Sequence, residues 1–349
     1  MDRYHASLPL HVERSGDSAE LRLGQGIYWG LFYEYTGLTG DTSYATFVDT
    51  NVQLALSSYN GQTAFLDAIS AASGRWNDDI GWWGISMMSA AEAMPNGVVA
   101  SFNLQQDDNP AYISVANATW SQMYENWDAS TCNGGIFWAR NRNAPNKDQA
   151  YYKSSITNAQ HIELSARLLA ATGDKSGIYQ AQFDQVYNWM KSAVINPATY
   201  EVSDGVNTQN NACSNSQLQF SYHSGELLAA LSRMYKYTKQ QTYLDEAHKH
   251  FAHIVSMFTQ NNVVYDPQCA GAGATGCKNP TGYNWAVYKG MADLSAVTDQ
   301  PSVKAQILTI FQASANAVIS TTCQDSWNCI RQLPECKALF VFDVSPVWT

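Results

Sequence analysis

The stretch KSSITNAQHIELSARLLAATGD, residues 153–174, decides the fold class. Its apolar residues recur three and four positions apart, the period of one face of an α-helix: Ile156, Ile162, Leu164, Leu168 and Leu169. Thr172-Gly173-Asp174 then ends the segment with a glycine, the residue that most readily adopts the left-handed backbone conformation after a helix. The pattern predicts a helix with a sharp stop.

The same pattern recurs along the chain. Helical periods predict helices near 20–37, 42–58, 78–94, 110–126, 153–172, 175–193, 216–238, 242–259, 282–298 and 302–321. Short turns follow several of them, at residues 35–41, 171–174, 237–240 and 297–300, whereas long Asn- and Gly-rich loops cover 59–77, 127–152, 194–215 and 260–281. Alternating short turns and long loops predict an all-α (α/α) toroid of about six hairpins, with function on the long-loop rim.

Composition narrows the function. Charged residues make up only 14% of the 349 residues and the formal net charge is −10. Nucleic-acid binding needs clustered Lys and Arg, so a nucleic-acid partner is not expected. No apolar run approaches the length of a membrane span, and no signal peptide is visible at the N-terminus. A surface of neutral polar groups suits a monomeric, secreted or cell-wall protein that handles neutral sugars.

The cysteines also favour an oxidising compartment. There are seven, and none forms a CxxC pair or a zinc-binding spacing. Disulfides are the better interpretation, and the local pair Cys269–Cys277 is plausible, although spacing alone leaves the pairing open. Asn117-Ala118-Thr119 is an acceptor sequence for N-glycosylation.

Candidate chemistry centres on Trp76-Asn77-Asp78-Asp79-Ile80-Gly81-Trp82-Trp83, where a long loop enters a helix. Two adjacent acidic residues at a helix start have a structural explanation, because they cap free N–H groups and face the positive end of the helix dipole. The functional explanation is a glycosidase carboxylate pair, in which mutual repulsion keeps one group protonated as an acid. Neighbouring tryptophans offer flat faces to sugar rings. Spacing alone favours capping.

An ordered set of motifs resembles glycoside hydrolase family 76, the α-1,6-mannanases, including the fungal Dfg5/Dcw1 cell-wall branch. The matching stretches cover most of residues 25–300: 29–35, 39–44, 77–79 with 82–84 and 90–92, 127–128, 132–138, 153–158 with 166–168, 204–207, 222–225 and 288–290. The resemblance implies one (α/α)6 domain over residues 1–349. Whether a terminal helix is absent at one end or both is left open.

The resemblance also implies a retaining mechanism and assigns residues to it. Asp78 is expected to be the nucleophile and Asp79 the acid/base, with Asp204 contacting the sugar. Further candidates for binding substrate are Trp82, Trp138, Asn158, Tyr222 and Lys289. Two positions depart from the family's usual residues: Ile80 follows the Asp pair where Gln is usual, and His223 stands where Asn is commoner.

Three functions remain open on the sequence alone. The first is a retaining endo-α-1,6-mannosidase acting on mannan. The second is a cell-wall transglycosidase that processes mannan glycans linked to a GPI remnant, using the same carboxylates. The third is a non-catalytic glycan-binding toroid, against which the retained Asp pair weighs.

No cofactor or metal is expected. His248, His250 and His253 share one predicted helix, but matched carboxylates are not evident, so a solvated helix face is favoured over a metal site. No phosphate-binding Gly-rich loop appears, and Ser224 does not lie in a serine-hydrolase elbow.

Overall fold

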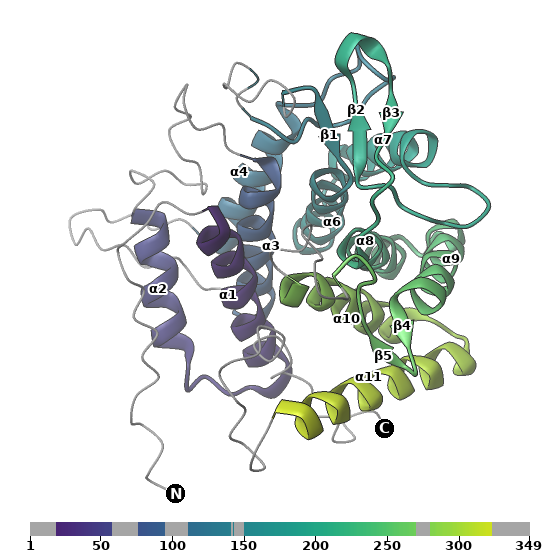
Figure 1. Ribbon diagram of the computed structural model, residues 1–349. Helices are drawn as coiled ribbons and strands as arrows, with labels where there is room; N and C mark the ends of the chain where they lie inside the picture. The colour runs from purple at the N-terminus through teal and green to yellow at the C-terminus, as the bar shows by residue number, and fades with distance from the viewer. Residues whose placement is uncertain are drawn as a thin grey trace, which may run out of the picture.

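A computed structural model describes residues 19–57, 76–94, 111–140, 142, 150–269 and 280–322. The question of a missing terminal helix concerns residues outside these ranges. Within them the molecule is built almost entirely of helices (Figure 1).

Every helix that the sequence predicts is present, within a few residues at each end. The helices are α1 (Ala19–Thr39), α2 (Ala45–Ser57), α3 (Asn77–Ala93), α4 (Tyr112–Tyr124), α6 (Ser155–Thr172), α7 (Ile178–Ala193), α8 (Ser221–Thr238), α9 (Gln241–Phe258), α10 (Pro280–Val297) and α11 (Pro301–Thr322), with a 3₁₀ turn at Gln209–Asn211. The all-helical class and the hairpin pattern are therefore confirmed.

The helices form an inner series and an outer series. Contacts pass from α1 to α3, then to α6, α8 and α10, and the following helix of each pair packs outside its partner (Figure 1). Burial follows this division: every described residue of α6 from Ser155 to Leu169 is buried, whereas α7 and α9 bury one face only. A helix that is buried all round belongs to the interior of a ring.

Local chemistry sets the helix ends and the close approach of inner helices. At the start of α6 the Ser154 hydroxyl accepts a hydrogen bond from the Thr157 N–H, and at its end Gly173 adopts φ 59°. Gly225 of α8 and Gly290 of α10 touch: a Cβ on Gly290 would lie 2.4 Å from the Gly225 carbonyl oxygen. These glycines cost helix propensity and are retained because α8 and α10 pack too closely for any side chain.

Ion pairs fill the axis of the inner ring. The Lys289 ammonium of α10 reaches Glu163 of α6, at 2.5 Å, and Glu226 of α8, at 2.8 Å, so one contact spans the ring past α8. Farther along, Arg233 of α8 reaches across to Glu92 of α3 at 3.2 Å. Lys289 and its two carboxylates are almost fully buried, while Glu92 is 42% exposed, so the cluster runs from the interior to one end of the ring.

The long loops meet in a layer of short strands at the N-terminal ends of the inner helices. Strands β1 (Tyr152–Ser154), β2 (Gly205–Asn207) and β3 (Ser214–Asn215) form an antiparallel sheet in that order, with Lys153 opposite Val206. Single bridges join Trp76 to Ala139 and Trp127 to Ile136. A separate pair, β4 (Thr259–Gln260) and β5 (Val263–Val264), follows α9.

The sequence-based interpretation of the α9 histidines is wrong for two of them. His250 is fully buried and His253 is 8% exposed, so neither lies on a solvated face. His250 packs edge-on against Tyr200, and burial lowers its pKa to about 3. A buried aromatic side chain can take part in the core without a charge, and the hydrophobic period of α9 does not reveal this.

Candidate active site

The first turn of α3 carries the acidic pair and is tied to the loop that follows α4. The Asn77 backbone N–H donates to the Trp138 carbonyl at 2.7 Å, and its side-chain amide donates to the Phe137 carbonyl, also at 2.7 Å. Asp78 and Asp79 come next, both half-buried. Trp76 is the N-cap and gives α3 no side-chain cap, so the start of α3 is held by the loop carbonyls.

Asp78 lies where a charge is costly. Burial raises its pKa from 3.8 to about 7, and the nearby Asp204 carboxylate adds to the rise. Hydrogen bonds act in the opposite direction and lower the pKa of Asp78. The Trp138 indole N–H donates to Asp78 Oδ1 at 2.7 Å, and the backbone N–H groups of Asp78 and Asp79 also favour the ionised form. Asp78 can therefore exchange a proton near neutral pH, which is a property of catalytic carboxyls.

Asp204 approaches from the loop between α7 and α8. Its carbonyl accepts from the Ser155 N–H and its own N–H donates to the Leu218 carbonyl, both at 2.8 Å, which fix its backbone beside the start of α6. Its side chain is 23% exposed. Burial alone would raise the pKa of Asp204, but His223 and the Tyr152 hydroxyl outweigh burial and lower it. The site thus joins a carboxyl that titrates near neutrality to one that stays ionised.

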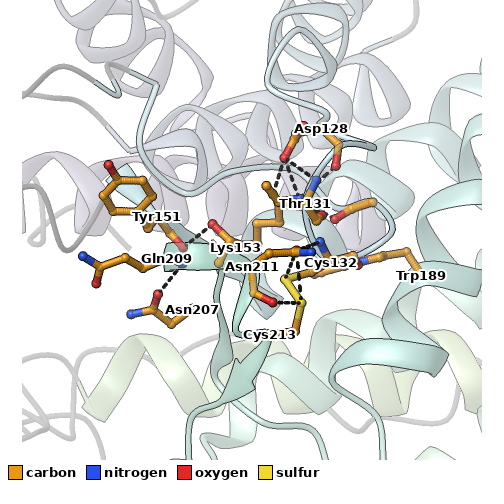
Figure 2. Close-up of a disulfide and its surroundings, with 12 residues drawn as sticks. Asp128, Thr131, Cys132, Tyr151, Lys153, Trp189, Asn207, Gln209, Asn211 and Cys213 are labelled. Atoms are coloured by element: carbon orange, nitrogen blue, oxygen red, sulfur yellow. Dashed lines mark hydrogen bonds and ion pairs between the residues drawn. A yellow bond between two sulfur atoms is a disulfide. The ribbon is translucent and has the colours of Figure 1, made fainter.

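Buried polar groups hold the Gly-rich loop at residues 128–138. The fully buried Lys153 ammonium donates to the carbonyls of Asp128, Thr131 and Gly134 at 2.6–2.8 Å and pairs with the Asp128 carboxylate at 3.1 Å (Figure 2). Burial lowers the pKa of Lys153, while Asp128 opposes that shift. The loop is shaped around this cation, which explains how a flexible sequence can present Trp138 in one place.

A disulfide joins this loop to the β2–β3 hairpin. Cys132 is bonded to Cys213, which lies 81 residues farther along the chain, and the Cys132 N–H donates to the Asn211 side chain at 2.9 Å (Figure 2). The loop that carries Trp138 is thereby linked to the hairpin that follows Asp204. Cys269 is also disulfide-bonded; Cys277, its suggested partner, lies outside the described residues.

Aromatic rings flank Asp78 on one side. Trp138 stacks on Trp76, with ring centroids 4.2 Å apart and planes 12° from parallel, and Tyr152 meets Trp138 edge-on at 6.0 Å. Trp138, Trp76 and Tyr152 are partly exposed. Trp82 differs, because it is 3% exposed and packs edge-to-face against Trp285. Trp138 is therefore the better placed of the two tryptophans named from the sequence.

Of the remaining candidates, Asn158 and Lys289 are buried, whereas Tyr222 is half-buried. Asn158 is fully buried, and its amide bonds the N–H and carbonyl of Ile136 at 2.9 and 3.1 Å, so it supports the Gly-rich loop. Lys289 is 5% exposed and engaged by two buried carboxylates. Tyr222 is half-buried, and its ring contacts that of His223, which lies next to the Asp204 carboxylate; the two ring centroids are 4.2 Å apart and the planes are tilted by 53°.

Three residues of the site, Tyr152, His223 and Trp76, were not among the catalytic or binding candidates named from the sequence. Trp76 belongs to the acidic motif and His223 departs from the family's usual Asn, so a sequence signal could have pointed to both. Tyr152 had none, because its contact with Asp204 arises from pairing of two three-residue strands.

The described part of the chain contains no group of three or more His, Cys, Asp or Glu side chains placed to hold a metal ion. None of its helices is long and apolar enough to cross a membrane.

An all-α toroid that carries paired carboxylates and stacked tryptophans on its loop rim defines the class of helical-toroid glycosidases. The family model of glycosyl hydrolase family 76 matches residues 16–334. The chain belongs to glycoside hydrolase family 76.

Curated relatives and solved structures agree with this. Mannan endo-1,6-alpha-mannosidase DCW1 of Candida glabrata is 26% identical over 291 residues, 83% of this chain and 61% of that protein. The corresponding protein of Candida albicans is 30% identical over 61% of this chain and 44% of its own length. The chain thus spans less than two thirds of these relatives.

Among solved structures, Dfg5 from Chaetomium thermophilum in complex with glucosamine is 28% identical, with a TM-score of 0.72 over 84% of this chain and 68% of that one. The GH76A alpha-1,6-mannanase of Salegentibacter sp. HEL1_6 shares the fold, with a TM-score of 0.69 over 87% of this chain and 80% of that one at 16% identity.

Proposed function

We propose that this chain is a retaining endo-α-1,6-mannosidase that acts on mannan, with Asp78 and Asp79 as its catalytic pair. The observation that carries the proposal is the setting of Asp78: next to Asp79 at the start of α3, its carboxyl accepts a hydrogen bond from the Trp138 indole N–H at 2.7 Å and lies near the Asp204 carboxylate. The curated relatives support the substrate, because they are named as mannan endo-1,6-alpha-mannosidases.

In the proposed reaction Asp78 attacks the anomeric carbon while Asp79 protonates the leaving oxygen, and Asp79 then activates water to release the glycosyl group. The Trp138 N–H would stabilise Asp78 as a carboxylate before attack. A retaining pair needs carboxyl groups about 5–5.5 Å apart, so we expect the two side chains to approach that separation with substrate bound.

We propose further that Asp204, Trp138 and Tyr222 contact the sugar. Asp204 offers a half-buried, ionised carboxylate that can accept hydrogen bonds from hydroxyl groups. Trp82, Asn158 and Lys289, the other sequence candidates, are buried, and we assign them the support of that surface from behind.

The test is hydrolysis of α-1,6-linked mannan oligosaccharides by three proteins: the wild type, Asp78→Asn and Asp79→Asn. We expect both variants to lose at least about three orders of magnitude in kcat with unchanged circular dichroism, as expected for removal of a nucleophile or an acid. The anomeric form of the first product, followed by NMR, separates retention from inversion. Full activity in both variants would refute the proposal.

A second candidate is transglycosylation on a cell-wall glycan. It is favoured by the similarity to Dfg5, which was solved with an amino sugar bound. Both reactions use the same glycosyl-enzyme intermediate and differ in the acceptor, water or a sugar hydroxyl. Products longer than the starting oligosaccharide, detected by mass spectrometry at high acceptor concentration, would identify transfer.

The proposed location is the cell wall or the extracellular space. The Cys132–Cys213 disulfide supports an oxidising compartment, where such bonds persist. We propose that the protein acts there as a monomer.

A further inference from the structure

The Asp204 carboxylate is held from both sides. The Tyr152 hydroxyl, from β1, donates to Oδ2 at 2.5 Å, and His223 Nε2, from α8, lies 3.3 Å from Oδ1. Each oxygen thus faces one protein group, and a carboxylate has about four acceptor directions, so two remain for other donors. Two points of attachment stop the carboxylate from rotating about its last bond.

His223 is an unusual residue to bury for packing alone. Its side chain is fully buried, and while Nε2 lies 3.3 Å from Asp204 Oδ1, the other ring nitrogen, Nδ1, has no hydrogen-bond partner within the described residues. Burying an unbonded polar group costs free energy, so a structural role would be better served by an apolar side chain. Its Nε2 faces the Asp204 carboxylate, which lies near Asp78, so the imidazole is placed to hold that carboxylate.

We propose that Tyr152 and His223 are positioning residues that hold the Asp204 carboxylate in one orientation beside Asp78. The role of Asp204 toward substrate rests on the proposed function, whereas the clamp rests on geometry alone. Neither Tyr152 nor His223 needs to touch the sugar for this purpose.

The charged and titratable groups that face Asp204 in the described chain come from three elements. Tyr152 from β1 and His223 from α8 favour its ionised form, and Asp78 from α3 repels it. Loss of either clamp member therefore leaves the repulsion from Asp78 less opposed. The expected result is a higher pKa for Asp204 and a less ordered side chain.

The experiment compares Tyr152→Phe with Tyr187→Phe. Tyr187 is a matched control, because its hydroxyl also donates to a carboxylate, Glu246, at 2.9 Å, but between the outer helices α7 and α9. In Tyr152→Phe we expect kcat/KM on α-1,6-mannotetraose to fall roughly 10- to 100-fold. The pKa of Asp204 itself should rise by roughly one unit. Tyr187→Phe should keep both.

A second pair of variants tests His223. Asn keeps an N–H donor, so His223→Asn should retain most of the activity, whereas His223→Leu should behave like Tyr152→Phe. A Tyr152→Phe protein whose kcat/KM matches that of Tyr187→Phe would overturn the clamp. Equal activity of the two His223 variants would remove His223 from it.

An activity-independent measurement separates this inference from the proposed function. Protein labelled with ¹³C at the aspartate carboxyl, with Asp204→Asn used for assignment, reports the pKa of Asp204 by NMR titration. The value should be higher in Tyr152→Phe than in wild type, and an unchanged value would refute the inference. If the pKa of Asp204 is higher in Tyr152→Phe than in wild type but the wild type does not cleave mannan, only the proposed function is refuted.

Discussion

Replacing Asp78 with Asn should make the protein more stable at pH 8 while it removes activity. The pKa of Asp78 is raised from 3.8 to about 7 by burial, so the folded protein must ionise a carboxyl that resists ionisation. Each unit between folded and unfolded pKa corresponds to about 1.36 kcal/mol, so the whole effect is about 4 kcal/mol. Asn has nearly the same shape and carries no charge.

The sign follows from proton binding. Between pH 3.8 and about 7 the folded state binds more protons at Asp78 than the unfolded state, so this residue's contribution to stability falls as pH rises through that range. The contribution is full below pH 3.8 and is gone above about pH 7. About 2.5 kcal/mol of the change is expected between pH 5 and pH 8.

The assay is urea unfolding of wild type and Asp78→Asn at pH 5 and pH 8. The stability advantage of the variant should increase by about 2.5 kcal/mol between the two values. Asp174→Asn is the control: Asp174 caps a turn through the Ser176 N–H and hydroxyl, which lower its pKa from 3.8, so it is ionised in both states at pH 5 and at pH 8 and the effect of this variant should not change between them. An advantage for Asp78→Asn that does not change with pH would refute a raised pKa at Asp78.

Other variants test separate parts of the site. Trp138→Phe keeps the ring and removes the N–H donor to Asp78; the pKa of Asp78 should rise by about one unit, and the acid limb of kcat/KM should follow. A limb that stays in place would exclude Asp78 as the group that must be ionised. Lys289→Met leaves two buried carboxylates without their cation. The free energy of unfolding in urea at pH 7 should fall by about 3–5 kcal/mol, with little change in KM; a change in KM without destabilisation would indicate that Lys289 contacts substrate directly. Cys213→Ser releases Cys132 and should lower the free energy of unfolding by up to about 4.5 kcal/mol on a loop-entropy estimate, measured against oxidised wild type; equal stability would contradict the estimate.

The helices could be predicted from the sequence because their information is local. The apolar period and the glycine stop of residues 153–174 are enough to define α6, and the structure places it at Ser155–Thr172. The short strands could not be predicted, because two or three residues carry no recognisable period. Tyr152 meets Asp204 only through such a strand pair.

The roles of the buried polar residues could not be predicted from the sequence either. A lysine near the start of a predicted inner helix looks the same in the sequence whether it faces substrate or a carboxylate. Lys289 is engaged by Glu163 and Glu226, which come from helices far away in the chain. Asn158 likewise bonds the Ile136 backbone, a contact set by how the loop folds over α6.

The ion pairs across the inner ring make the toroid a cup and not a tube. Arg233 and Lys289 reach past neighbouring helices to Glu92 and Glu163, so side chains close the axis beneath the acidic pair. A polymer cannot be threaded through such a molecule. If the chain cleaves mannan as proposed, the polymer has to lie across the mouth of the cup, and both fragments leave by the side from which the polymer entered.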